Sequence, residues 1–481
     1  MDFKDFSQLL INKFSFSPTD DQITAIGELS KFLISNNDIG LFILKGYAGT
    51  GKTTSMSVLV KLLPKYQMKA ILLAPTGRAA KVLGNYSQKP AFTIHKKIYR
   101  KKSAVEFGSG FSLAKNTHTD TLFIVDESSM IPGDVQEGQY FGGNSLLSDL
   151  ITYVYESDSN CKILFLGDTA QLPPVGASES PALNPTYLQD HFGLKVFSAE
   201  LKEVLRQEKK SGILENATAL REQLLAENIS KPSMQVKNFK DFFYITGEKL
   251  VDGINYAYDH FGMDETLIIC RSNKNANLYN QQIRARILFR EEFISSGDFL
   301  MVVKNNYHWL PESSDGEFIA NGEIAKVIRI RNEQEMYGLK FADASLQLVD
   351  FPTQPIITAK IILDTLDSDS PALSNAQQKH LYEQVALDYS DIKNKSERLA
   401  KIKTDPYYNA LQVKFSYAVT CHKSQGGQWK AVFVDQGYLT DELVNKEFIR
   451  WLYTAITRAS EQLFLVNFNK DFIVDLPKDN F

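Results

Sequence analysis

A glycine-rich segment, Gly46-Tyr-Ala-Gly-Thr-Gly-Lys52-Thr53, carries the clearest chemical pattern of the chain. It follows an apolar run at 41–44 and opens an amphipathic stretch, the strand-to-helix setting of a phosphate loop. Glycines let backbone N–H groups approach phosphates, and the helix N-terminus adds positive potential. Lys52 is expected to reach the β- and γ-phosphates of ATP, and Thr53 to help hold Mg²⁺. A plain glycine turn is the alternative, which the Lys-Thr pair disfavours. The residues predicted to bind this cofactor are Gly46, Ala48, Gly49, Thr50, Gly51, Lys52, Thr53 and Thr54.

Two adjacent acids, Asp126 and Glu127, come directly after the apolar run at 121–125. A strand end places them at the carboxyl edge of a sheet, where open α/β sheets bind ligands. Asp126 suits the Mg²⁺ shell, and Glu127 suits activation of a water for attack on the γ-phosphate. Alone, such a pair is usually only solvated. Beside a phosphate loop, it is predicted to be catalytic.

A third strand-end segment, Gly167-Asp-Thr-Ala-Gln171-Leu-Pro-Pro174, follows the apolar run at 162–166. An amide at a strand end can touch both a γ-phosphate and a neighbouring domain, so Gln171 is a candidate sensor of nucleotide. A proline-containing loop without function explains the segment equally well.

Nucleotide hydrolysis also needs positive charge where the transition state becomes negative. Arg206 and Arg458 are the candidates, because an arginine supplied to such a site contributes roughly 10³–10⁵ in rate. Taken singly, either arginine is more often part of a surface ion pair. The predicted catalytic set is Lys52, Glu127, Gln171, Arg206 and Arg458.

Two segments after expected strands combine hydroxyls, cations and an aromatic ring, which suits a nucleic-acid strand. Hydroxyls and helix starts grip phosphates, and aromatic rings stack on bases. A dense basic run follows at 96–102, for which a solvated face is the alternative. The residues of these two segments that could contact a nucleic-acid strand are Pro75, Thr76, Arg78, Lys81, Phe92, Thr93 and His95.

Composition limits the class of protein. The chain has 481 residues, 43% of them hydrophobic, which predicts more than one globular domain. Its formal net charge of −4 excludes a basic protein that coats nucleic acid by bulk charge, so a strand must be gripped in a local groove. The three cysteines are far apart, which fits a reducing compartment. With no apolar run of about 18 residues, we expect no membrane association and a cytoplasmic location.

The elements that position these residues are predicted from apolar runs. Short, nearly continuous runs at 41–44, 70–74, 121–125 and 162–166 alternate with helical patterns, as in a parallel sheet covered on both faces. A second alternating region includes 266–270, 431–434 and 462–466. Residues 100–120 are expected to form a small hairpin insertion. Residues 323–414 are expected to form a small β-barrel-like insertion with a helical arm.

Taken together and in order, these motifs resemble the superfamily 1B DNA helicases, and in particular their RecD-like and Dda-like 5′-to-3′ group. The resemblance covers about residues 17–461 and eight motifs. It would assign Gln22 to the adenine, Gln171 to γ-phosphate sensing, and Arg206 and Arg458 to phosphate contacts. The segment 418–428 looks like motif V, which couples DNA and nucleotide. From that motif the resemblance adds Thr420 and His422 as DNA contacts and Gln428 to the nucleotide site.

The resemblance implies an α/β fold with two RecA-like P-loop motor domains. The first motor domain would comprise 1–97 and 119–205, and a pin-bearing 1B insertion would occupy 98–118. The second would comprise 206–322 and 415–481, and an SH3-like 2B insertion with a helical arm would occupy 323–414. ATP and Mg²⁺ would be the cofactors.

The function implied is an ATP-dependent DNA helicase that moves 5′-to-3′ on single-stranded DNA and opens duplex junctions. We expect a monomer, working with or without a single-strand-binding protein. The principal alternative is an ATP-driven translocase or clamp that moves on single-stranded DNA without unwinding. A small-molecule kinase or transporter-type ATPase has no use for the segment from Gln425 to Arg458.

Overall fold

The computed structural model describes residues 3–14, 17–34, 40–101, 111–134, 144–156, 160–204, 211–226, 229–310, 319–350 and 354–474. The chain divides into two compact units, which we treat separately. Unit 1 comprises residues 1–101 and 109–209, and unit 2 comprises 102–108 and 210–481.

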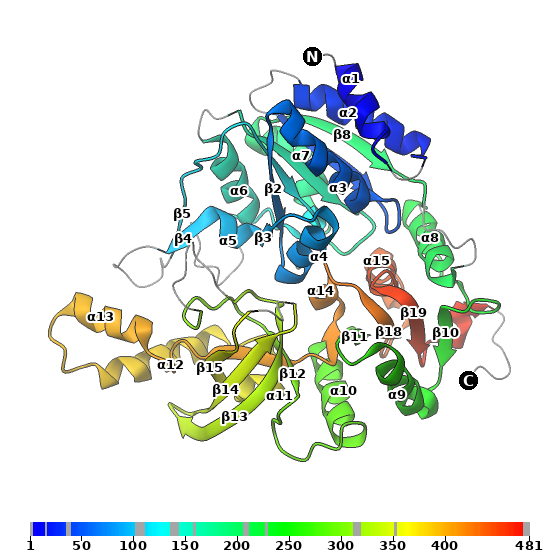
Figure 1. The fold of residues 1–481 in the computed structure, drawn as a ribbon. Coiled ribbons are helices and arrows are strands. Elements are labelled where there is room, and N and C mark those ends of the chain that lie inside the picture. Colours follow the sequence, from blue (N-terminus) through cyan, green and yellow to red (C-terminus); the bar gives the residue numbers. More distant parts are fainter. Residues whose placement is uncertain are drawn as a thin grey trace. The chain divides into compact units, whose positions relative to one another are not determined.

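Unit 1 is built on a parallel sheet (Figure 1). Six strands of the described residues pair in the order β3-β2-β6-β7-β1-β8, and every pairing is parallel. The strands are β1 (Gly40–Gly46), β2 (Lys69–Ala74), β3 (Ala91–Thr93), β6 (Thr121–Val125), β7 (Lys162–Gly167) and β8 (Lys195–Leu201). The helices are α1 (Phe3–Ile11), α2 (Asp20–Ile34), α3 (Lys52–Leu62), α4 (Gly77–Ser87), α5 (Ile94–Ile98), α6 (Leu146–Tyr155) and α7 (Pro185–Phe192).

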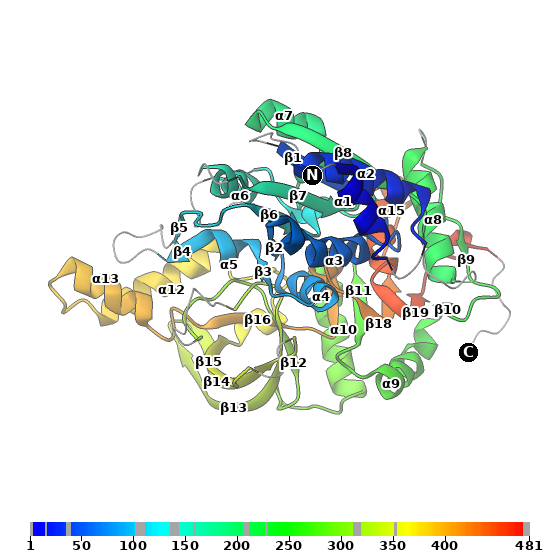
Figure 2. The same ribbon diagram turned by 45° about the horizontal axis from the view of Figure 1, so that its top comes forward.

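Alternate residues of the unit 1 strands enter two different cores, one on each face of the sheet. Phe42 and Leu44 of β1 pack with α1, α2, α3 and α4, whereas Leu41 and Ile43 pack with α5, α6 and α7. Because both faces are buried, the strands read as unbroken apolar runs. The predicted runs at 41–44, 70–74, 121–125 and 162–166 are confirmed as strands. Figure 2 shows the sheet between its helical layers.

The expected hairpin region contains an antiparallel pair, β4 (Tyr99–Lys101) and β5 (Phe111–Leu113), in which Arg100 pairs with Ser112. The residues that would connect these strands, 102–110, lie outside the described residues. The assignment of this pair to a strand-separating pin therefore stays a prediction.

Unit 2 contains a second parallel sheet and a barrel. Five strands of the described residues form the sheet, in the order β10-β19-β18-β11-β17. They are β10 (Phe242–Ile245), β11 (Thr266–Cys270), β17 (Ala418–Thr420), β18 (Trp429–Asp435) and β19 (Ala459–Val466). The helices outside the barrel are α8 (Gly212–Leu225), α9 (Leu250–Phe261), α10 (Asn273–Arg286), α14 (Cys421–Ser424) and α15 (Lys446–Ile456), and β9 (Met234–Gln235) pairs with β20 (Ile473–Val474).

The barrel interrupts this sheet between β11 and β17. Its strands are β12 (Phe299–Val302), β13 (Ile324–Met336), β14 (Leu339–Leu348), β15 (Ile357–Ile362) and β16 (Leu411–Phe415), and they close on one another. After the short helix α11 (Asp364–Asp367), α12 (Asn375–Asp388) and α13 (Lys395–Thr404) form an arm whose Leu381 and Ile402 join the core of Phe341. The barrel also uses β12, which precedes residue 323.

A buried charge cluster joins the barrel to the elements around the unit 2 sheet. Asp298, immediately before β12, is fully buried and accepts from Arg284 of α10 at 3.1 Å and from the hydroxyl of Tyr417 at 2.8 Å. Arg290 also donates to Asp298 and, at 2.8 Å, to Tyr417. Because Tyr417 directly precedes β17, this cluster fixes the strand that begins the segment 418–428.

Of the helices in the described ranges, none combines the length and apolar character that a bilayer-spanning segment requires. All three cysteines are buried, and none of them is in a disulfide.

Candidate nucleotide and nucleic-acid sites

The phosphate loop connects the end of β1 to the start of α3. Gly49 and Gly51 both have φ of 82°, in the left-handed region that favours glycine, so the sequence needs glycine at these positions. The side chain of Lys52 turns back onto the loop and donates to the carbonyls of Gly46 and, at 3.0 Å, of Tyr47. Its ammonium therefore lies among the backbone groups predicted to surround the phosphates.

Two side chains from other elements hold this loop in place. Nε2 of Gln22, in α2, donates to the carbonyl of Thr50 at 3.1 Å, and the hydroxyl of Tyr47 donates to Glu200 of β8 at 3.0 Å. The carbonyl oxygen of the Gln22 amide accepts from the backbone N–H of Thr19 at 3.2 Å, and the Thr19 hydroxyl accepts from the Gln22 N–H at 3.3 Å. This reciprocal capping fixes the start of α2 and so aims the Gln22 amide at the loop.

The acidic pair, Asp126 and Glu127, directly follows the end of β6. Burial and the nearby Glu127 carboxylate raise the pKa of Asp126 above its usual range, while its hydrogen bond with the Thr53 side chain opposes the rise. Asp126 also accepts from the backbone N–H of Glu127 at 2.9 Å. Glu127 itself has φ of 50°, an unusual conformation for a side-chain-bearing residue and one that often marks functional sites.

The residues proposed for Mg²⁺ fit a divalent cation. Thr53 and Asp126 come from different elements and meet as a hydroxyl and a carboxylate, which are hard oxygen ligands of the kind Mg²⁺ takes. Two neighbouring carboxylates in a buried setting are destabilised by their shared charge, and a cation there would relieve that repulsion.

Gln171 is nine-tenths buried after β7, and the carbonyl oxygen of its side-chain amide has no hydrogen-bond partner in the described part of the chain. The preceding turn is held by Asp168, whose carboxylate accepts from the N–H of Ala170 at 2.9 Å. In the sheet order, β6, β7 and β1 are neighbours and run parallel. The structure thus gathers Lys52, Asp126, Glu127 and Gln171 at one carboxyl edge.

The candidate DNA contacts of unit 1 follow β2 and β3, farther along the same edge. Thr76 and Thr93 cap the helices α4 and α5, accepting from the N–H groups of Ala79 at 3.3 Å and Lys96 at 3.2 Å. Pro75, Arg78 and Lys81 lie partly exposed beside Thr76. Each hydroxyl oxygen already accepts a backbone N–H of its helix, but the hydroxyl hydrogen can still be donated to a phosphate oxygen.

The second group of these candidates surrounds Phe92. The ammonium groups of Lys96 and Lys97 lie 5.9 Å and 5.7 Å from the centre of its ring, within cation–π range. Burial lowers the pKa of His95 to about 4, and its ring lies 5.8 Å from that of Tyr99. His95 is therefore neutral at pH 7 and offers a strand only a hydrogen bond, not a charge.

In unit 2, the segment resembling motif V starts at the end of β17. Thr420 is partly exposed at the strand end, and burial lowers the pKa of His422, in α14. Gln428 is partly exposed just before β18. The three residues thus span the connection from β17 through the short helix α14 to the start of β18.

Arg458 is 3% exposed and links the end of α15 to the segment of unit 2 that resembles motif V. Its guanidinium donates to the carbonyls of Thr454 at 3.0 Å and Gly427 at 3.2 Å, and to the hydroxyl of Thr457 at 3.3 Å. Arg206, the other candidate arginine, lies outside the described residues.

The sequence interpretation missed the residues that hold the site rather than form it. Thr19 contacts Gln22, and Glu200 contacts Tyr47. The spacing of Thr19 and Gln22 fits a capping box and could have been recognised in the sequence, whereas Glu200 belongs to no recognisable pattern. Asp21 was also missed; its carboxylate accepts from the N–H groups of Lys202 and Glu203 at 2.9 Å and 3.1 Å, which ties α2 to the end of β8.

The fold and the gathered residues define a P-loop ATPase. Comparisons with known proteins indicate which kind of P-loop ATPase it resembles. A family model described as an AAA domain matches residues 29–235, and one described as a UvrD-like helicase C-terminal domain matches 415–466. The uncharacterized protein R530 of Acanthamoeba polyphaga mimivirus is 26% identical, over 92% of this chain and 98% of its own length.

Two named helicases are also similar. The ATP-dependent RecD2 DNA helicase of Deinococcus radiodurans is 32% identical, over 28% of this chain and 16% of its own length. The ATP-dependent DNA helicase dda of Enterobacteria phage T4 is 25% identical, over 59% of this chain and 62% of its own length. A crystal structure of Pif1 helicase from Bacteroides aligns over 96% of this chain and 95% of that one, with 14% identity and a TM-score of 0.47. By these family and relative matches, the chain is similar to the superfamily 1B helicases, which are ATP-driven motor enzymes.

Proposed function

We propose that this protein hydrolyses ATP to move 5′-to-3′ along single-stranded DNA and to unwind duplex DNA. The observation that carries the proposal is the edge of the unit 1 sheet, where Lys52, Thr53, Asp126 and Glu127 converge. The match to a UvrD-like helicase C-terminal domain supports a second motor element in unit 2. The direction of movement rests on the resemblance to the RecD-like and Dda-like group.

The residues of unit 1 divide the ATPase chemistry among themselves. Lys52 leaves its loop carbonyls to bind the β- and γ-phosphates, and the backbone N–H groups of the loop hold the remaining phosphate oxygens. Thr53 and Asp126 hold Mg²⁺, which neutralises phosphate charge when bound. Glu127 orients and deprotonates the attacking water. The unpaired amide oxygen of Gln171 senses the γ-phosphate or the water aligned with it.

The remaining assignments follow the motifs. Arg458 and Arg206 supply positive charge to the transition state. To do so, Arg458 must give up at least one of its hydrogen bonds within unit 2. The strand is gripped in unit 1 by Thr76, Thr93 and the Phe92 ring, and in unit 2 by Thr420 and His422. The hairpin β4–β5 acts as the 1B pin and the barrel with α12 and α13 as the 2B insertion.

Unwinding of tailed duplexes tests this function. Fluorescently labelled duplexes with a 5′ or a 3′ single-stranded tail are mixed with the protein, ATP and Mg²⁺, and strand release is followed in real time. We expect release from the 5′-tailed duplex only. Translocation along the tail without release would instead support the clamp alternative. Release from the 3′-tailed duplex alone would refute the proposed direction.

A further inference from the structure

The barrel of unit 2 has an outer face on three neighbouring strands, β13, β14 and β15. The inner positions of these strands, such as Val327, Ala344 and Leu346, are buried. At one end of the outer face, Phe341 and Ile362 pack against the arm of α12 and α13. The outer positions beyond the arm are Lys326, Arg329, Arg331, Asp343, Ser345, Gln347, Thr358 and Lys360.

A bulge in β13 brings three cations onto this face. Lys326 and Arg329 are three residues apart, so in a regular strand their side chains would point to opposite faces. The register of β13 with β14 shifts between them, and the partners on β14 are alternate residues of one strand. Since alternate residues share a face, the three cations of β13 lie on it together. The pairs are Lys326 with Gln347, Arg329 with Ser345, and Arg331 with Asp343.

This face carries an excess of positive charge. Its carboxylate within the described residues is Asp343, which accepts from the Lys360 ammonium at 2.7 Å and is thereby neutralised. Lys326, Arg329 and Arg331 remain. All three are exposed, and their side chains make no hydrogen bond or ion pair within the described part of the chain. They stand out in a protein whose formal net charge is −4. The three cations together with Ser345 and Thr358 are called the basic face below.

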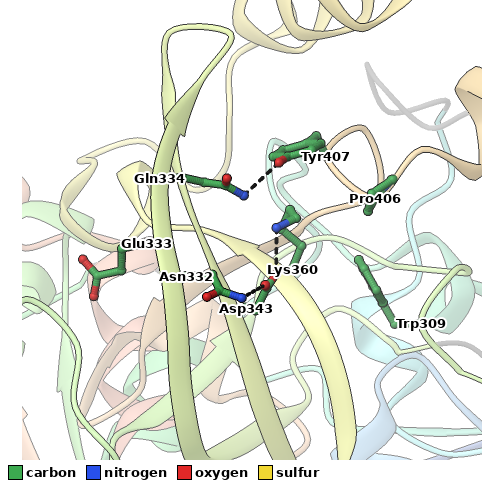
Figure 3. Close-up of a pocket in the computed structure, with 8 residues that line it drawn as sticks. All are labelled: Trp309, Asn332, Glu333, Gln334, Asp343, Lys360, Pro406 and Tyr407. Carbon is green, nitrogen blue, oxygen red and sulfur yellow. Dashed lines mark hydrogen bonds and ion pairs between the residues drawn. The ribbon is translucent and has the colours of Figure 1, made fainter.

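Figure 3 shows the end of the basic face, where a surface cavity of about 700 Å³ begins. There the Asn332 amide donates to Asp343 at 2.9 Å, beside the ion pair of Asp343 with Lys360. The carboxylate of Glu333, on the same strand as Asn332, points away from Asp343 and Lys360. Glu333 therefore does not offset the positive charge of the basic face.

A row of cations beside hydroxyl groups suits the phosphates of a nucleic-acid backbone. Alternate residues of a strand rise by about 6.7 Å, so long Arg and Lys side chains can reach successive phosphates of one backbone. The hydroxyls of Ser345 and Thr358, which are paired across β14 and β15, can donate to the same phosphates. Contacts of this kind hold DNA in place without reading its sequence.

The side chains of the basic face favour duplex DNA over a single strand. Single-strand sites combine cations with aromatic rings on which bases stack. No outer position of β13, β14 or β15 beyond the arm is aromatic in the described residues. Phe299 of β12, whose ring centre lies 6.0 Å from the Lys326 ammonium, is buried, and Tyr407 is held edge-on against Phe341 at 5.1 Å.

We propose that the basic face binds the phosphate backbone of duplex DNA. This role rests on the proposed helicase function, which brings a duplex to the chain. The competing occupants are a single DNA strand and an acidic segment of a partner protein, and binding measurements distinguish all three.

Salt-dependent binding of duplex DNA to the full chain is the test. A fluorescein-labelled, blunt-ended duplex is titrated with protein at several salt concentrations without nucleotide, and its anisotropy gives the affinity. The test variant combines Lys326→Gln, Arg329→Gln and Arg331→Gln. The control variant loses the same charge at exposed lysines of unit 2 outside the barrel, and combines Lys237→Gln, Lys240→Gln and Lys249→Gln.

Each phosphate contact contributes about 0.9 to the slope of log affinity against log salt concentration. We expect the test variant to bind the duplex more weakly, with a slope reduced by about 2.7, and the control variant to keep the wild-type slope. A wild-type slope in the test variant, as for a face that takes an acidic protein segment, would overturn the proposal, and so would equal reductions in both variants. Loss of affinity for oligothymidylate with duplex affinity retained would assign the face to a single strand instead.

ATP hydrolysis stimulated by oligothymidylate separates this proposal from the helicase function. We expect it to persist in the test variant. Lys52→Ala should lose hydrolysis but keep the wild-type affinity and salt slope for the duplex. If the wild type hydrolyses ATP in response to oligothymidylate but does not bind the duplex saturably, the role of the basic face is refuted and the motor function is not.

Discussion

The contact between Gln22 and the phosphate loop makes a quantitative prediction. Gln22 is 1% exposed, and its amide donates to the carbonyl of Thr50 at 3.1 Å. Gln22→Met keeps most of the side-chain volume but removes the donor, which leaves a buried carbonyl without that partner. Such a loss costs about 1–3 kcal/mol. If this whole free energy is lost from phosphate binding by the loop, nucleotide affinity falls roughly 5- to 150-fold.

The loss should be equal for ATP and GTP, because the loop contacts phosphates that both nucleotides share. Binding is measured by titrating the protein with fluorescent analogues of each nucleotide. Thr19→Ala is the matched control. It removes the hydroxyl that caps α2 and costs about 0.5–2 kcal/mol of stability, but leaves the bond from Gln22 to Thr50 in place. Its nucleotide affinities should stay close to those of the wild type.

The family resemblance instead implies that Gln22 recognises the adenine base, and this role predicts a different result. In that case Gln22→Met would weaken ATP and leave GTP unchanged, since only adenine would lose a partner. A selective loss of ATP binding would therefore refute the loop-holding role of Gln22. An equal loss in Thr19→Ala would show that the effect comes from the start of α2 rather than from the amide.

Three further predictions follow from buried or strained groups. Asp298→Asn leaves Arg284 and Arg290 without their carboxylate and should lower the free energy of unfolding in urea by about 3–5 kcal/mol, whereas Asp343→Asn, at a partly exposed pair, should cost about 0–1 kcal/mol. The pKa of His95 falls from 6.5 to about 4 on folding, so the unfolded chain binds more protons between these values. Stability should therefore drop as pH falls from about 6.5 towards 4, by at most about 3 kcal/mol, and His95→Gln should flatten this part of the pH profile. Glu127→Gln should retain ATP binding but lose hydrolysis by at least about 100-fold, and near-normal turnover in that variant would remove Glu127 from the water-activating role.

Much of the unit 1 sheet and its site could be predicted because both depend on local sequence. Strands buried on both faces are continuous apolar runs, and the residues that follow them share one edge by parallel topology. The edge strand β8 was missed because Lys195–Leu201 mixes polar and apolar residues, most of them exposed or only partly buried, and so contains no continuous apolar run. The three-residue β3 is too short to give a pattern of its own.

Other features depend on contacts that are distant in sequence. Asp298 is an ordinary acid in the sequence, and only folding brings Arg284, Arg290 and Tyr417 around it. The bulge at Asn332, where the register of β13 with β14 shifts, could not be predicted from the sequence either, because its residues continue the polar face of β13. Arg458 was predicted from its motif, but its bond to the carbonyl of Gly427 depends on how the loop before β18 folds.

Stimulation of ATP hydrolysis by single-stranded DNA tests the central claim most directly. The rate is measured with and without oligothymidylate for the wild type, for Lys52→Ala and for Lys61→Ala, a matched control at the far end of α3. We expect strong stimulation in the wild type and in Lys61→Ala, and no hydrolysis in Lys52→Ala, which should unfold at the same urea concentration as the wild type. Hydrolysis at the wild-type rate in Lys52→Ala, or a wild-type rate indifferent to the oligonucleotide, would contradict a P-loop motor that works on single-stranded DNA.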